Sequence, residues 1–278
     1  MSALRQRVIT SVFFVLAMLG GVFGGAITFT LLFLAIQVLC SMEFFKMVLP
    51  LITRRDRLRY GIALAFSLAP TLFAVFYYQT LPDFTNLWYW HFAWVFFMAF
   101  LLFMMLELFL EGERPFANLA FMLLGIVYIG IPFAFLQFIA FWKSEFAMSM
   151  ILALLVMNWL NDTAAYLIGS RLGKHKILPR ISPQKSWEGT LSGIGVTVVI
   201  GIICYLLVGD YTLWQWICLA VLVAVLGFLG DLIESMLKRT VGIKDSGGIL
   251  PGHGGMLDRF DGFIFMLPFV AGYLYFLG

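Results

Sequence analysis

The chain has 278 residues, of which 62% are hydrophobic and only 12% are charged, and its mean hydropathy is +0.98. This composition leaves too little polar surface to cover a water-soluble globule, so it excludes a soluble enzyme and indicates an integral membrane protein. The net charge of +3 is small and gives no support to a nucleic-acid partner.

Nine apolar segments follow one another along the chain. A helix needs about 20 apolar residues to cross roughly 30 Å of hydrocarbon, and the alternating pattern of a membrane barrel is absent. The sequence therefore predicts an all-α polytopic membrane protein with about nine transmembrane helices. They are expected near residues 8–24, 26–50, 60–80, 88–110, 116–142, 146–168, 190–208, 214–235 and 262–277. The first segment ends in glycines, so a cleaved signal peptide is an alternative for it.

The positive residues predict the orientation of these helices, because loops rich in Lys and Arg stay on the cytoplasmic side. With the N-terminus inside, all but one of the 18 Lys and Arg residues lie at the inner surface, and the exception is Lys143. Two long polar connections, residues 171–189 and 235–261, then share the cytoplasmic face. No transit peptide is visible, which favours a bacterial inner membrane over an organellar one.

The end of the eighth segment carries a polar stripe. Its members are spaced at i, i+3, i+4 and i+7, which places them on one helix face, and they are Asp231, Glu234, Ser235 and Lys238. Hard cations such as magnesium prefer oxygen ligands and often bridge phosphate groups. The cysteine and histidine clusters typical of zinc are missing. The stripe therefore indicates magnesium more than zinc.

Three further aspartates extend this candidate site. Asp258 and Asp261, three residues apart, can point two carboxylates in one direction. At 1.5 Å per residue, Asp162 and Asp231 both lie about 25 Å from the outer surface, in the cytoplasmic third of the bilayer. Acids within a membrane are functional candidates by default, although Asp162 could instead pair with a neighbouring Asn or Lys. We assign one or two magnesium ions to Asp231, Asp258, Asp261 and Asp162.

Positive charge and glycine gather in the same part of the chain. Lys and Arg bind phosphate, and glycines let backbone N–H groups approach anionic oxygens. A loop resting on lipid headgroups would explain the basic residues but not the acids beside them. The mixture indicates a metal and phosphate site, with the candidates Lys238, Arg239, Lys244, Asp245, Arg259, His253, Gly254 and Gly255. His253 could contact phosphate or brace the glycine turn.

These residues form a family pattern. The run Ser235-x-x-Lys238-Arg239, Lys244-Asp245, Pro251-x-His253-Gly254-Gly255 and Asp258-Arg259-x-Asp261 resembles the signature of phosphatidate cytidylyltransferases, the enzymes that make CDP-diacylglycerol. Residues 162–169 and the stretch "SPQKSWEG" at residues 182–189 are similar to the same family. The part of the chain before them matches only in being helical and apolar.

The resemblance implies transfer of CMP from CTP to phosphatidate, with magnesium, in a helical homodimer that opens to the cytoplasm. Residues 1–145 would form a scaffold and dimerisation region, and residues 146–278 would form the catalytic region. Lys238, Arg239, Lys244 and Arg259 would neutralise the triphosphate and the lipid headgroup, while Lys185 and Ser182 close the site from the other loop. Such transfers depend on positioning and charge stabilisation, so we expect Ser235 to orient its neighbours rather than to act as a nucleophile.

Other interpretations are weaker. Residues 169–175, "GSRLGKH", have one residue too few between the glycines for a nucleotide-binding P-loop, and they end in His175. The stretch "DRFDG" opens like the CDP-alcohol phosphotransferase motif, but no acid follows it. A CTP-dependent lipid or polyprenol kinase is the enzymatic alternative. An ion-coupled transporter is the alternative of another class, although the chain lacks matching halves.

The remaining acids of the apolar segments are expected to be structural. Glu43 can pair with Lys46 at helical spacing near the inner interface. Glu107, Glu111 and Glu113 can remain at the same surface. The sequence therefore predicts no chemistry for these four acids.

Overall fold

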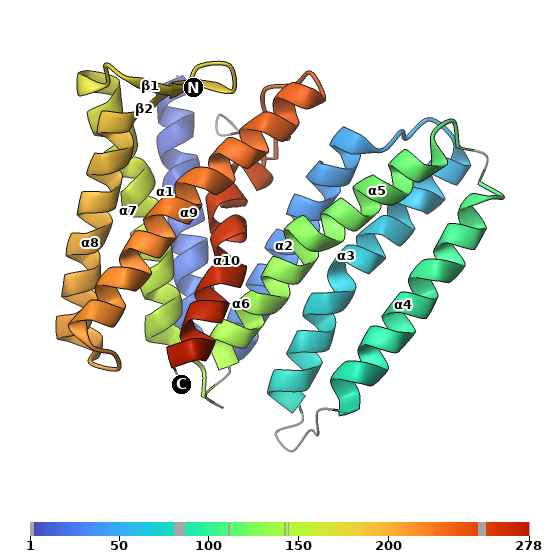
Figure 1. Ribbon diagram of the computed structural model, residues 1–278, viewed down its shortest axis with the longest axis horizontal. Helices are drawn as coiled ribbons and strands as arrows, with labels where there is room; N and C mark the ends of the chain where they lie inside the picture. The colour runs from blue at the N-terminus through green and yellow to red at the C-terminus, as the bar shows by residue number, and fades with distance from the viewer. Residues whose placement is uncertain are drawn as a thin grey trace.

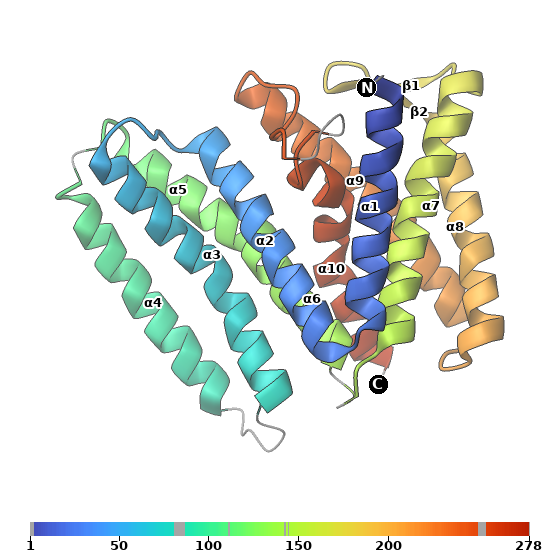
Figure 2. The ribbon, with the colours of Figure 1, turned by 180° about the vertical axis from the view of Figure 1, so that it is seen from behind.

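The computed structural model describes residues 3–80, 87–110, 112–141, 143, 145–249 and 254–277. Within these ranges the chain is a bundle of long helices with one short hairpin (Figures 1 and 2). In chain order the elements are α1 (Ala3–Phe23), α2 (Ala26–Val48), α3 (Arg54–Thr80), α4 (Leu87–Glu107), α5 (Pro115–Gly125), the π-helical turn η1 (Ile126–Gly130), α6 (Ile131–Phe141), α7 (Met148–Leu172), β1 (Lys176–Leu178), β2 (Ser182–Ser186), α8 (Trp187–Val208), α9 (Leu213–Thr240) and α10 (Leu257–Leu277).

The predicted number of helical segments is confirmed. Among the described residues, eight stretches are long and apolar enough to cross a membrane, with α5, η1 and α6 counted as one, and α1 adds a shorter apolar stretch. The helix ends differ from the prediction, since α9 continues to Thr240 and α10 begins at Leu257. Backbone hydrogen bonding carries both helices past their apolar segments, so the polar stripe and the two C-terminal acids lie on helices rather than in a loop.

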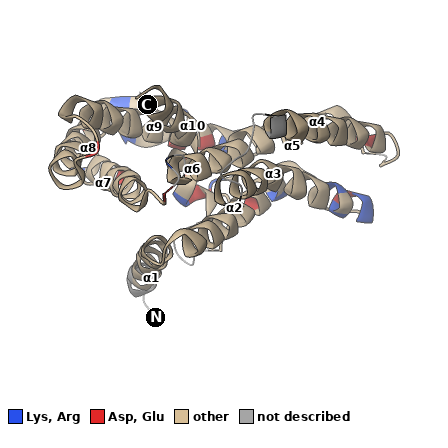
Figure 3. Ribbon diagram, turned by 90° about the horizontal axis from the view of Figure 1, so that it is seen from below, with Lys and Arg blue, Asp and Glu red and all other residues tan. Residues whose placement is uncertain are grey.

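The helices form two groups joined by α10. One group contains α2, α3 and the stretch from α5 to α6, with α4 at its rim, and the other contains α7, α8 and α9, with α1 alongside α7 (Figures 2 and 3). Helix α10 packs against α9 and also against α6 and α2. Phe33 of α2 stacks on Phe263 of α10 with 6.1 Å between ring centroids, and it meets Phe260 edge-on. These contacts fix α2 against the first turns of α10.

Glycines set the contact between α9 and α10. A Cβ atom on Gly230 would lie 2.7 Å from the Cβ of Phe265 and 2.8 Å from the carbonyl oxygen of Asp261. A Cβ atom on Gly262 would lie 2.6 Å from the carbonyl oxygen of Gly227. In lipid, helices associate through close packing of such small residues. The contact brings Asp231, the residue after Gly230, next to the turn of α10 that carries Asp261.

A hairpin and a loop lie together at one end of the bundle. Strand β1 pairs antiparallel with β2, with Lys176 opposite Ser186 and Leu178 opposite Ser182. Figure 1 shows this hairpin and the connection from α9 to α10 at the same end, and the C-terminus at the other. The prediction that the two polar connections share a face is confirmed.

Candidate functional site

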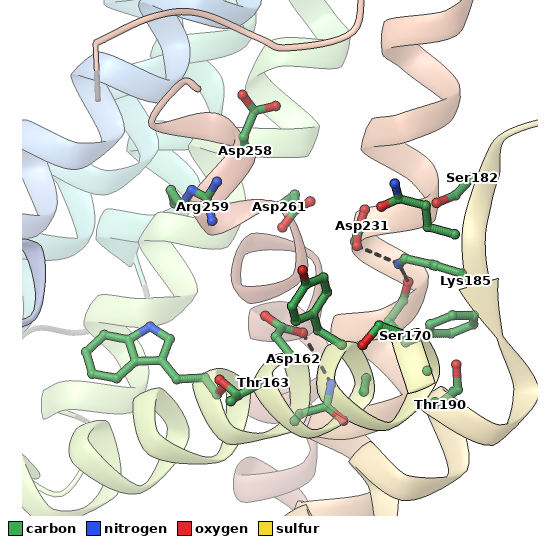
Figure 4. Close-up of a pocket in the computed structure, with 18 of the residues that line it drawn as sticks. Asp162, Thr163, Ser170, Ser182, Lys185, Thr190, Asp231, Asp258, Arg259 and Asp261 are labelled. Carbon is green, nitrogen blue, oxygen red and sulfur yellow. Dashed lines mark hydrogen bonds and ion pairs between the residues drawn. The ribbon is translucent and has the colours of Figure 1, made fainter. Parts of the chain in front are cut away.

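A cavity of about 1000 Å³ lies at this end of the bundle. Its walls come from α1, α7, the hairpin, the start of α8, α9 and the start of α10. Figure 4 shows Asp162 of α7, Asp231 of α9 and Asp261 of α10 around the same space. Acids from three helices, well separated in the sequence, therefore share one cavity.

Asp231 connects α9 to the hairpin. Its Oδ2 lies 2.6 Å from Nζ of Lys185, and its Oδ1 accepts a hydrogen bond of 3.2 Å from the hydroxyl of Ser235. Lys185 Nζ also donates to the carbonyl oxygen of Phe228 at 3.3 Å and lies 4.6 Å from the centre of that ring. The lysine predicted to close the site from the other loop thus reaches the polar stripe of α9.

Lys238 connects α9 to α10. Its Nζ lies 2.8 Å from Oε2 of Glu234 and 2.7 Å from Oδ1 of Asp258. The Glu234 side chain has no exposed surface, and its Oε1 has no hydrogen-bond donor among the described residues. A buried carboxylate oxygen without a donor is costly. Within the described part of the chain, only Oε2 of the two Glu234 oxygens is paired, by Lys238.

Asp258 holds the loop that precedes it. Its Oδ2 accepts hydrogen bonds from the backbone N–H of Ser246 at 3.0 Å and of Gly255 at 2.7 Å. Gly254 has a φ of 83°, which favours glycine, and a Cβ atom there would lie 2.6 Å from Oδ2 of Asp258. The glycine pair lets the loop fold back onto this carboxylate.

The stretch at residues 182–189 builds the opposite wall. Ser186 caps α8 by accepting a hydrogen bond of 3.3 Å from the N–H of Gly189. A Cβ atom on Gly189 would lie 2.9 Å from Cα of Gly169, so the glycine lets α8 approach α7 closely. Glu188 accepts hydrogen bonds from the backbone N–H groups of Lys174 and His175 and so closes the base of the hairpin. These contacts fix the strand from which the site lysine extends.

The cavity acids fit magnesium in their chemistry. They offer oxygen donors, and no histidine or cysteine is among the described residues that line the cavity. No three Asp, Glu, His or Cys side chains of the described residues converge closely enough to form a cage by themselves. Magnesium often takes only one or two carboxylates, together with waters and substrate phosphates. Asp261 suits that arrangement, whereas Asp231 would have to give up its contact with Lys185, and Asp258 a contact with Lys238 or a backbone amide.

Comparison with known proteins assigns the chain to a family. A family model described as "Cytidylyltransferase family" matches residues 5–277, which is nearly the whole chain. The chain belongs to the cytidylyltransferase family. Among its relatives named phosphatidate cytidylyltransferase, that of Staphylococcus saprophyticus is 42% identical over 159 residues, that of Staphylococcus aureus strain COL 43% over 160, and that of Staphylococcus epidermidis 40% over 159. Each match covers 57% of this chain and 60% of the relative.

Most of the site residues that were predicted from the sequence line this cavity. They are Asp162, Ser182, Lys185, Asp231, Lys238, Asp245, Asp258, Arg259 and Asp261. Ser235 does not line the cavity but donates a hydrogen bond to Asp231. Gly254 and Gly255 lie next to the carboxylate of Asp258. Arg239 and Lys244 are exposed and do not line the cavity. His253 lies outside the described residues, and the roles assigned to all these residues stay predictions.

Two acids expected at the surface are buried, so that expectation was wrong for them. Glu43 is 3% exposed while Lys46 is exposed, and Glu43 instead contacts residues 246 and 257. Glu107 is also 3% exposed and accepts hydrogen bonds from Arg59. The local spacing of Glu43 and Lys46 suggested a pair, although an acid in an apolar segment was itself a signal. Glu113 is exposed as expected, and Glu111 lies outside the described residues.

Part of the cavity wall was not predicted from the sequence. Thr10 and Ser11 of α1 and Trp159 of α7 line the cavity. Uncharged residues in apolar segments carry no signal of their own. Only the packing of α1 beside α7 reveals them.

Proposed function

We propose that the protein transfers CMP from CTP to phosphatidate, giving CDP-diacylglycerol and pyrophosphate for phospholipid biosynthesis. One observation carries the proposal: carboxylates from three helices and the cations Lys185, Lys238 and Arg259 line a single cavity at one end of a membrane bundle. Membership of the cytidylyltransferase family supports nucleotidyl transfer. The relatives named phosphatidate cytidylyltransferase support phosphatidate as the acceptor.

The position of the cavity suits one lipid and one water-soluble substrate. Its lining includes apolar residues of the membrane helices, such as Phe14, Val15 and Trp159, together with polar residues of the hairpin. Phosphatidate would bring its headgroup from the bilayer, and CTP would arrive from the aqueous side. The distribution of Lys and Arg along the sequence supports the cytoplasmic face of a bacterial inner membrane, with the N-terminus inside.

In the proposed reaction a phosphate oxygen of phosphatidate attacks the α-phosphorus of CTP. The new P–O bond forms while the bond to the oxygen that bridges to the β-phosphate breaks, and pyrophosphate leaves with that oxygen. Such transfers need positioning and charge stabilisation rather than a protein nucleophile. Lys185, Lys238 and Arg259 would bind the phosphate oxygens and offset their charge. Ser235, which donates its hydroxyl hydrogen to Asp231, would orient that carboxylate.

Magnesium, as one ion or two, would supply Lewis-acid stabilisation of the phosphate charge. Asp231 and Asp261 would hold it, with Asp162 beside them and Asp258 as the further predicted ligand. Lys185 now neutralises Asp231 at 2.6 Å. If Asp231 held magnesium, Lys185 would be available to bind a substrate phosphate.

The remaining predicted residues surround this centre. Ser182 and Asp245 line the cavity, and exposed Arg239 and Lys244 would attract the nucleotide from the edge. The contribution of His253 to phosphate binding and the homodimer implied by the resemblance stay predictions.

The test is product analysis with purified protein, magnesium, phosphatidate and CTP labelled at either the α- or the γ-phosphate. We expect the α-label in a CDP-lipid and the γ-label in pyrophosphate, with activity lost in EDTA and restored by magnesium. A lipid kinase would instead move the γ-label to the lipid. If a folded sample forms no CDP-lipid, the proposed function is wrong.

A further inference from the structure

We infer that Glu43 of α2 is a positioning residue, which holds Ser246 and the start of α10 in the places that the cavity requires. Its Oε2 accepts hydrogen bonds from the backbone N–H of Leu257 at 2.8 Å and from the hydroxyl of Ser246 at 3.2 Å. More than 200 residues of sequence separate Glu43 from both partners. The effect on rate rests on the proposed function, whereas the contacts do not depend on it.

Both partners of Glu43 lead directly to the cavity. Ser246 donates its hydroxyl hydrogen to Glu43 and its backbone N–H to Asp258, so this one residue connects the two carboxylates. Leu257 is the first residue of α10 and precedes Asp258 in the chain. Asp258 in turn contacts Lys238 at 2.7 Å. Glu43 therefore acts on two cavity residues without lining the cavity itself.

The loop is shaped around this carboxylate. A Cβ atom on Gly247 or on Gly255 would collide with the carboxylate of Glu43. The stack of Phe33 on Phe263 keeps α2 against α10 at the same junction. Gly247 and Gly255 thus leave the space that Glu43 occupies.

A purely space-filling role would not need a carboxylate here. Glu43 is 3% exposed, and its Oε1 has no hydrogen-bond donor among the described residues. Burying such a group is costly, and apolar side chains often fill the same volume at equal or better stability. The carboxylate accepts a hydrogen bond from the first N–H of α10, which has no partner within its own helix. It also places a negative charge at the positive end of that helix.

The first test compares Glu43→Ala, Glu43→Gln and Glu43→Asp in the CDP-lipid assay. We expect Glu43→Ala to lower kcat by about 10- to 100-fold, as is usual for residues that orient ligand groups. Glu43→Gln keeps an acceptor oxygen and should recover most of that loss, whereas Glu43→Asp is one carbon shorter and should recover less. Because Lys185 is held by Asp231 and not by the contacts of Glu43, the KM for CTP should change less than kcat.

Two further variants separate positioning from general stability. Glu107→Ala is the matched control, since Glu107 is an equally buried membrane acid in contact with Arg59 and away from the cavity. Its kcat per folded molecule should stay close to that of the wild type. Ser246→Ala should lower kcat less than Glu43→Ala, and adding it to Glu43→Ala should cost little more, because both changes remove the same contact.

Hydrogen exchange of the Leu257 amide provides a readout that needs no activity. Exchange should accelerate in Glu43→Ala and remain slow in Glu107→Ala. An active wild type whose Glu43→Ala variant keeps its kcat and its slow exchange would overturn the inference. A wild type that forms no CDP-lipid but shows the expected exchange would overturn only the proposed function.

Discussion

Buried charges occur in both groups of helices, but they face different surroundings. In the N-terminal group, Arg59 of α3 is 1% exposed and lies 2.6 Å from Asp56 and 2.9 Å from Glu107 of α4. Asn118 of α5 donates a further hydrogen bond of 3.2 Å to Glu107. None of these residues lines the large cavity. The network joins three helices away from that cavity.

In the C-terminal group the charges surround that cavity. The Asp231 side chain is 42% exposed although it pairs with Lys185, and Asp261 and Asp162 line the same space. Lys238 forms ion pairs with both Glu234 and Asp258. We infer from this difference that the charges beside the cavity form the site, whereas the ions around Arg59 link helices. Substitutions in the two groups should therefore differ in their effect on activity.

Removing a cavity acid should stop the reaction. We expect Asp261→Asn to lower CDP-lipid formation by about 100-fold or more, because the amide keeps the shape but loses the charge that would hold magnesium. The magnesium concentration needed for half-maximal rate should rise in any residual activity. Asp210→Asn, in the exposed connection between α8 and α9, is the control and should match the wild type.

Separating α9 from α10 should weaken the site without changing a charge. Gly230→Ala forces a Cβ atom against the backbone of α10, so we expect kcat to fall by about 10- to 100-fold through misplacement of Asp231. Gly272→Ala on α10 meets nothing within 4 Å and should leave kcat unchanged. Equal activity of the two variants would mean that this close contact does not position the acids.

Removing the hairpin lysine should affect binding more than chemistry. Lys185→Ala should raise the KM for a phosphate-bearing substrate by about tenfold, as expected for the loss of one hydrogen bond to a charged group. Lys174→Ala, an exposed change that leaves the cavity lining intact, is the control. An unchanged KM for both CTP and phosphatidate in Lys185→Ala would argue against phosphate binding by this residue.

The smallest effect on activity is expected in the enclosed network. Glu107→Ala leaves the buried charge of Arg59 without one of its partners, so the free energy of unfolding should fall by about 3 kcal/mol. The kcat of the remaining folded protein should change by less than about twofold, because the network is away from the cavity. Thermal unfolding in detergent and the CDP-lipid assay measure the two quantities separately. A large loss of kcat at full folding would show that the two groups of charges are coupled.

Much of the site could be predicted because its chemistry is concentrated in the sequence. The spacing of Asp231, Glu234, Ser235 and Lys238 predicted one helix face, and the structure joins them in pairs along that face. Counting residues from the outer surface placed Asp162 and Asp231 at one depth, and both line the cavity. Glu43 was missed because its partners lie more than 200 residues away, where spacing along a helix gives no information.

The sequence alone determined the class of the protein, the number of helical segments and the shared end of its two polar connections, because hydrophobic length and charge distribution act locally along the chain. Tertiary structure alone decided which acids meet, since that depends on how closely α9 can approach α10 at Gly230 and how α2 packs on α10. Tertiary structure also decided that the acids of the C-terminal group line the cavity, whereas the ions around Arg59 do not. These outcomes depend on shape, and residues distant in the sequence determine that shape together.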